Sequence, residues 1–81
     1  MAVSTKHIVQ PYRKEGKRLV PDQPREFGTA ESARSAAQLT ATKKAGVVAY
    51  SVTGELEEGI IDETVILFRA GRVPGEMQDD E

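Results

Sequence analysis

The sequence predicts an α+β domain in which an antiparallel sheet of three to four strands carries one helix on one face, in the order β(β)αββ. Three observations predict this fold. Residues 30–45 are nearly all helix formers and include no glycine or proline. Two apolar runs, 47–53 and 64–70, follow it with the β-branched composition of strands. The whole chain has 81 residues, the size of a single domain.

We expect this domain to span residues 6–74, between a disordered N-terminus at 1–5 and a disordered acidic tail at 75–81. Its first element is a predicted strand over residues 6–13. Because Pro11 has no N–H for a sheet ladder, the strand is expected at a sheet edge or with a bulge at that position. A turn follows in which Gly16 supplies a positive φ. Residues 17–20 fit a short return strand, although their pattern leaves this open.

The helix carries start and stop signals. Thr29 is a good N-cap, because its hydroxyl can accept a hydrogen bond from the first turn. Lys43 and Lys44 are expected in the last turn, and Gly46 at the left-handed C′ position. One face of the helix carries apolar side chains that are small. Small side chains favour close packing of the helix on the chain's own sheet, and contact with a helix of another chain is the alternative. The small stripe consists of Ala33, Ala36, Ala37, Thr40 and Ala41.

The strand after the helix divides into two faces, with Val47 and Ala49 on one of them. These small side chains suit an alanine-rich helix, so Tyr50 and Phe68 are expected on the open face. One helix covers one face of a sheet. The other face must be covered by residues 6–28, by a ligand or by a second chain, and we expect a homodimer. The candidate interface is Val48, Tyr50, Val52, Ile66 and Phe68.

The charges are unevenly distributed along the chain. The net charge is −2, but residues 1–46 carry nine basic against four acidic residues, and residues 47–81 carry two against nine. This split is compatible with an anionic partner, with self-association, or with charges that the fold interleaves. A basic hairpin could grip phosphates and stack a base, and a solvated charged turn is the alternative. The candidate anion or nucleic-acid contacts are Tyr12, Arg13, Lys14, Lys17 and Arg18.

Several classes of function are disfavoured. The chain has no cysteine and one histidine, His7, so we expect no zinc site. The acidic run 55–58 lacks the spacing of a calcium loop, so we expect no metal and no cofactor. No base or nucleophile has a suggestive context, and an enzyme is not expected. No apolar run approaches the ~18 residues of a membrane span, and we expect a cytoplasmic protein without membrane contact.

These patterns together predict a small non-catalytic binding or regulatory protein that acts through protein–protein contacts. A nucleic-acid-binding module that uses the hairpin at 13–18 is the alternative. The two differ in their response to salt, because phosphate binding weakens steeply as salt rises.

Five segments carry a resemblance: Ile8 to Gln10, Ala33 to Leu39, Ala45 to Tyr50, Val65 to Phe68, and Ala70 to Gly71. Their order resembles the first βαββ half of the SPOR peptidoglycan-binding fold. The chain departs from it by a long insert at 13–28 and by the lack of the second α and β elements. Over residues 7–74 the chain also resembles short bacterial proteins of unknown function. The resemblance implies a bacterial source and assigns no site.

Overall fold

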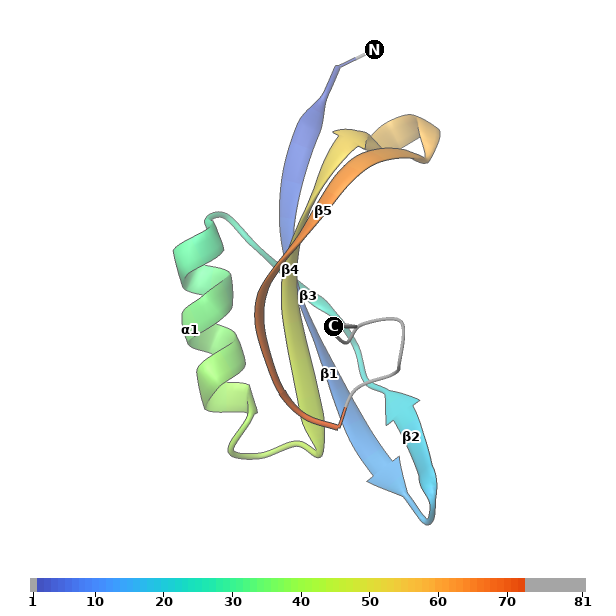
Figure 1. The fold of residues 1–81 in the computed structure, drawn as a ribbon, viewed down its shortest axis with the longest axis vertical. Coiled ribbons are helices and arrows are strands. Elements are labelled where there is room, and N and C mark those ends of the chain that lie inside the picture. The colour runs from blue at the N-terminus through green and yellow to red at the C-terminus, as the bar shows by residue number, and fades with distance from the viewer. Residues whose placement is uncertain (1, 73–81) are drawn as a thin grey trace.

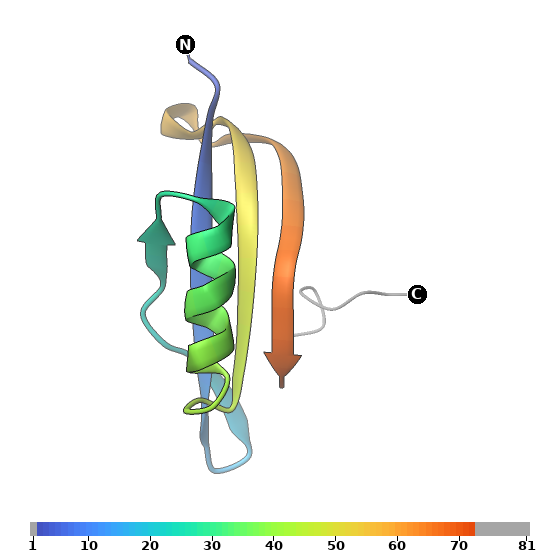
Figure 2. The ribbon, with the colours of Figure 1, turned by 90° about the vertical axis from the view of Figure 1, so that its left-hand side faces the viewer.

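A computed structural model describes residues 2–72 of the chain. Five strands form one antiparallel sheet in the order β2–β1–β4–β5, and β3 pairs with β1 beside β2. The one helix lies against one face of this sheet (Figures 1 and 2). The predicted α+β fold is therefore confirmed. The elements are β1 (Ser4–Glu15), β2 (Arg18–Pro21), β3 (Arg25–Phe27), α1 (Ala30–Thr40), β4 (Gly46–Glu55), the 3₁₀ turn η1 (Leu56–Glu58) and β5 (Ile60–Gly71).

Strand β1 is longer than predicted and lies inside the sheet, with β4 on one side and both β2 and β3 on the other. It begins at Ser4, within the range expected to be disordered. Pro11 faces Val47 of β4, and its carbonyl accepts a hydrogen bond from the Asp22 amide at 2.9 Å. The nitrogen of Pro11, which carries no hydrogen, therefore faces the loop between β2 and β3. No hydrogen bond of the ladder between β1 and β4 is lost at this residue. The expectation that Pro11 requires an edge strand or a bulge is therefore wrong, because β1 has paired strands on both sides.

The core on the helix side is built from small residues, as predicted for the alanine stripe. Ala33 and Ala37 are fully buried against Val9, Val47 and Ala49. Their short side chains let α1 lie close to β1 and β4, where larger side chains would hold the two layers apart. Close packing on the chain's own sheet is therefore the arrangement that the structure shows.

The helix ends earlier than predicted. It stops at Thr40, and the following amides of Thr42 and Lys43 bond three residues back, to Leu39 and Thr40. The Thr42 hydroxyl also donates to the Leu39 carbonyl at 2.8 Å, which competes with continued helix. Lys43 and Lys44 thus lie beyond the last turn.

Gly46 is not the C′ residue of α1; it begins β4 without a positive φ. A Cβ atom at this position would overlap the backbone of Arg72, so close approach is what requires glycine here. The turn prediction at Gly16 is confirmed, with φ of 65°. Residues 18–20 do form a strand, β2. The expected tail at 75–81 lies outside the described residues.

Candidate functional site

The sheet face opposite α1 carries the candidate binding surface. The register of β1, β4 and β5 places Ile8, Tyr50 and Ile66 side by side across three strands. Ile66 is 37% exposed, and Ile8 and Tyr50 are half-buried. The helix that the structure describes lies on the other face (Figure 2). These three residues, called the open-face patch below, therefore form an apolar surface that reaches solvent.

Part of this face is covered by the chain itself. Tyr12 and Val48 form a small buried cluster, with Leu19 and Tyr50 packed against it. Val48 is fully buried and Val52 is 7% exposed, so neither offers surface to a partner. Coverage by residues 6–28 and an open patch thus coexist on one face, where the sequence had offered them as alternatives.

Phe68 does not lie on the open face, which corrects the sequence-based expectation. It faces Ala49 and packs with Leu67 against the helix-side core. The reason is a register shift in the β4–β5 ladder: Ala49 faces Phe68 while Tyr50 faces Ile66, so Leu67 is the extra residue of a bulge. Without the bulge, strict alternation would place Phe68 on the same face as Ile66, which is the open face.

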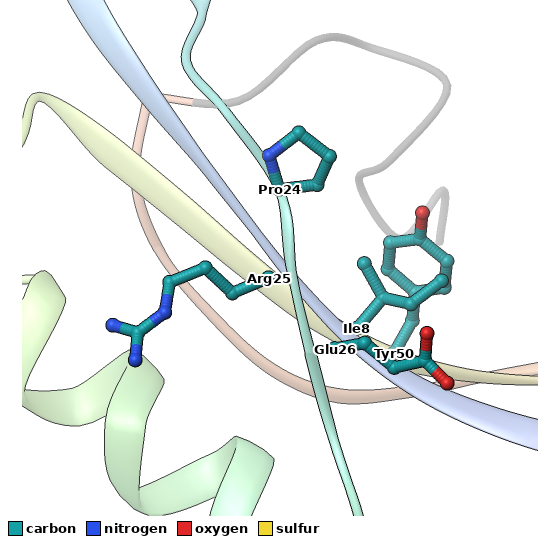
Figure 3. Close-up of a pocket in the computed structure, with 5 residues that line it drawn as sticks. All are labelled: Ile8, Pro24, Arg25, Glu26 and Tyr50. Atoms are coloured by element: carbon teal, nitrogen blue, oxygen red, sulfur yellow. The ribbon is translucent and has the colours of Figure 1, made fainter.

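A shallow hollow of about 220 Å³ adjoins the open-face patch. It is lined by Ile8, Tyr50 and the segment Pro24–Glu26. In Figure 3 the Glu26 carboxylate lies beside Ile8 and Tyr50, while the Arg25 side chain points toward α1. Arg25 stacks instead on Phe27, with its guanidinium carbon 5.2 Å from the ring centre. The hollow is therefore apolar at its floor and acidic at its rim.

The basic hairpin is only partly available for anions. Tyr12 is 6% exposed, so its ring cannot stack on a base. Arg13 is committed to two acidic neighbours: its Nε lies 2.9 Å from Glu15 and its Nη1 lies 3.5 Å from Asp22. Lys14, Lys17 and Arg18 remain exposed around the turn, as the sequence suggested.

Asp22 joins this hairpin to the segment that follows α1. Its Oδ2 accepts a hydrogen bond from Lys44 at 2.7 Å, and its Oδ1 accepts one from the Gln23 amide at 3.0 Å. The Lys44 bond, followed by the Gln23 amide and the positive charges of Lys44 and Arg13, holds the pKa of Asp22 below its ordinary value of 3.8. The ion pairs of Asp22 with Lys44 and Arg13 hold the loop between β2 and β3 in place. Because Arg13 is already paired with Asp22 and Glu15, it is not available to bind another anion.

His7 lies on the helix-side face, where its Nδ1 is 2.7 Å from the Ser51 hydroxyl. Within residues 2–72, no carboxylate is hydrogen-bonded to this ring, and no group of three potential metal ligands occurs. In the same part of the chain, no helix has the length and apolar character needed to cross a membrane.

Comparisons with protein-family models, with curated proteins and with solved structures gave no match to this chain. Sequence reasoning had found Tyr50 and Ile66 but missed Ile8 and Glu26. The pairing of β1 with both β3 and β4 brings these two residues to the patch.

Proposed function

We propose that the chain is a small non-catalytic binding module that acts through protein–protein contacts made by the open-face patch. One observation carries the proposal: the hollow beside Ile8 and Tyr50 lies on the sheet face opposite α1. Apolar surface around a pocket, with polar groups at its rim, is the usual anatomy of a protein interface.

The size and lining of the hollow favour a side chain over a small molecule. Pockets for cofactors and drug-sized ligands hold roughly 300–1,000 Å³ and enclose most of the ligand. The hollow here holds about 220 Å³ and is open to solvent. It suits one apolar or aromatic anchor from a partner, and Glu26 at its rim favours a lysine or arginine beside that anchor.

Catalysis has no place in the proposal. A His–Ser pair requires a third group that orients the imidazole before the serine becomes a nucleophile. Within residues 2–72, the His7 ring is hydrogen-bonded to Ser51 alone. The pair sits in line with a second cross-strand contact, the 2.9 Å approach of the Thr5 and Thr53 hydroxyls. Both contacts are best explained as ladder pairs that tie β1 to β4.

The proposal is tested by affinity capture from lysate of the source cells, with Tyr50→Arg as the surface variant. Leu39→Arg is the matched control, because Leu39 is 69% exposed on α1, away from the patch. We expect a defined set of proteins to be captured by the wild type and by Leu39→Arg and to be lost with Tyr50→Arg. Equal capture by all three proteins would remove the patch from the proposal. Thermal unfolding of each variant checks that the fold is kept.

Nucleic-acid binding through the hairpin is separated by a second assay. A fluorescent single-stranded oligonucleotide is titrated with the wild type and with a Lys14→Glu, Lys17→Glu double variant. The proposal predicts no salt-dependent binding by either protein. Tight binding by the wild type that falls with salt and with the double variant would favour the nucleic-acid module instead.

A further inference from the structure

The last described residue, Arg72, lies over the sheet face that carries the open-face patch. Gly46 shares one face of β4 with Val48 and Tyr50, because side chains alternate along a strand and the pairing of β4 with β1 is regular here. A Cβ atom at Gly46 would therefore point to the open face, and it would meet the backbone nitrogen, carbon and oxygen of Arg72. The backbone of Arg72 thus covers the open face at Gly46.

A glycine turns the chain onto this face at the end of β5. Gly71 has a φ of 72°, a conformation that glycine adopts without steric cost. The Arg72 amide then donates a hydrogen bond to the Ala45 carbonyl at 3.0 Å, which holds Arg72 beside the start of β4. The chain therefore leaves β5 on the open-face side, and the segment 73–81 follows from there.

The segment 73–81 is long enough to reach the hollow. Tyr50 lies four residues along β4 from Gly46, which is about 13 Å at ~3.3 Å per residue. Met77 follows Arg72 by five residues, which span up to ~17 Å when extended. Met77 therefore comes within reach of Ile8 and Tyr50, and its unbranched thioether side chain suits an irregular apolar hollow.

The charges favour the same placement. Residues 73–81 carry four acidic side chains and no basic one. On the open face, the strand register places Lys6 and Arg69 on either side of Tyr50, one toward each end of the strands, and both are exposed. Glu26 lies on β3, beyond β1, so a segment that arrives from β5 meets the face on the side away from this carboxylate.

We propose that residues 73–81 fold back over the open face, with Met77 at the hollow and the acidic side chains beside Lys6 and Arg69. The segment then occupies the surface that the proposed function assigns to a partner, so segment and partner compete. The exit, length and charge of the segment carry the fold-back, whereas the competition also rests on the proposed function. Salt weakens the fold-back, because its ion pairs lie at the surface.

A spin label tests the fold-back in the full chain, because the sequence has no cysteine of its own. The label is attached through Gln78→Cys, which keeps every charge, and the broadening of backbone amide signals is measured by NMR. We expect the amides of Ile8 and Tyr50 to broaden more than that of Gln38, which is exposed on α1. Equal broadening of the three amides, or none at any of them, would overturn the fold-back.

Charge reversal separates docking from simple tethering. In the labelled chain, the Lys6→Glu, Arg69→Glu double variant is compared with Lys17→Glu, Lys43→Glu, which changes the net charge equally at exposed positions in the hairpin turn and after α1. We expect the first pair, like raised salt, to reduce the broadening at the hollow several-fold, and the second pair to keep it. Equal broadening in the two double variants would overturn the fold-back. Thermal unfolding checks both, and Lys6→Glu alone replaces a first pair that does not fold.

The competition is measured by the affinity capture described above, with the acidic segment neutralised by Glu76→Gln, Asp79→Asn and Asp80→Asn. We expect this variant to capture several-fold more of the wild-type set of proteins. Unchanged capture by a chain whose label shows the fold-back would overturn the competition. Failure of the proposed function has a separate sign, equal capture by the wild type and Tyr50→Arg, and the NMR broadening decides the fold-back in that case too.

Discussion

The ammonium group of Lys44 lies 2.7 Å from Oδ2 of Asp22, which joins the segment after α1 to the loop between β2 and β3. The same aspartate is 3.5 Å from Arg13 of β1. Three segments that are distant in sequence thus meet at one carboxylate. The contact also uses a lysine that local sequence signals had assigned to the helix dipole.

This contact predicts a pH dependence of stability. The folded-state pKa of Asp22 lies below 3.8, chiefly because Lys44 donates to its carboxylate. A depressed pKa means that the stabilisation is present above pH 3.8 and is lost as the pH falls through the folded-state pKa. We expect Asp22→Asn to lower the melting temperature at neutral pH, with a difference that shrinks below pH 3.8. A difference that stays constant down to pH 2 would contradict this assignment; thermal unfolding by circular dichroism measures it.

Glycine at position 54 is predicted to be irreplaceable for a steric reason. A Cβ atom there would overlap the backbone carbonyl of Ile60, at the register shift between β4 and β5. We expect Gly54→Ala to lower the free energy of unfolding by about 1–3 kcal/mol. Gly28→Ala is the control, because a Cβ atom there meets nothing within 4 Å. The control is expected to be neutral or to stabilise by about 0.4–1 kcal/mol. Equal losses in the two variants, measured by urea unfolding, would refute the steric account.

The start of α1 depends on one hydroxyl. Oγ1 of Thr29 accepts a hydrogen bond from the Ser32 amide at 3.0 Å. We expect Thr29→Ala to cost about 1 kcal/mol of stability, while Thr29→Ser keeps most of it. Chemical denaturation of both variants measures the difference. If serine and alanine cost the same, the cap hydrogen bond is not the cause.

The seam between α1 and the sheet has no room for larger side chains. Ala37 is fully buried against β4, whereas its neighbour Gln38 is exposed. We expect Ala37→Leu to destabilise the fold by about 1–3 kcal/mol through overpacking, and Gln38→Leu to leave the free energy of unfolding nearly unchanged. A tolerated Ala37→Leu, judged by urea unfolding, would show that the helix can move away from the sheet at little cost.

Signals confined to a few neighbouring residues predicted the structure well. The N-cap at Thr29 and the turn at Gly16 depend on local backbone chemistry, and both were found where expected. The end of the helix was not found where expected, because the Thr42 hydroxyl donates a hydrogen bond to the Leu39 carbonyl and so competes with a further helical turn. β3 was missed for a related reason. Its three residues, Arg25–Phe27, have no strand pattern of their own and become a strand by pairing with β1.

The binding surface was predicted in part. Alternation along β4 correctly separated Val47 and Ala49, on the helix side, from Tyr50. It failed at Phe68, because the bulge at Leu67 is set by pairing with β4 and leaves no mark in the sequence of β5 alone. The hollow could not be predicted at all, since Glu26 meets Ile8 only through the β1–β3 register.

The most direct test of the proposed protein contact is photo-crosslinking in the source cells, with a benzophenone amino acid at position 50 or, as the control, at position 39. The account predicts adducts of one or a few discrete masses from position 50 and none of these from position 39. The same pattern of adducts from both positions, or none from position 50 while the protein remains folded, would contradict the assignment of binding to the open face.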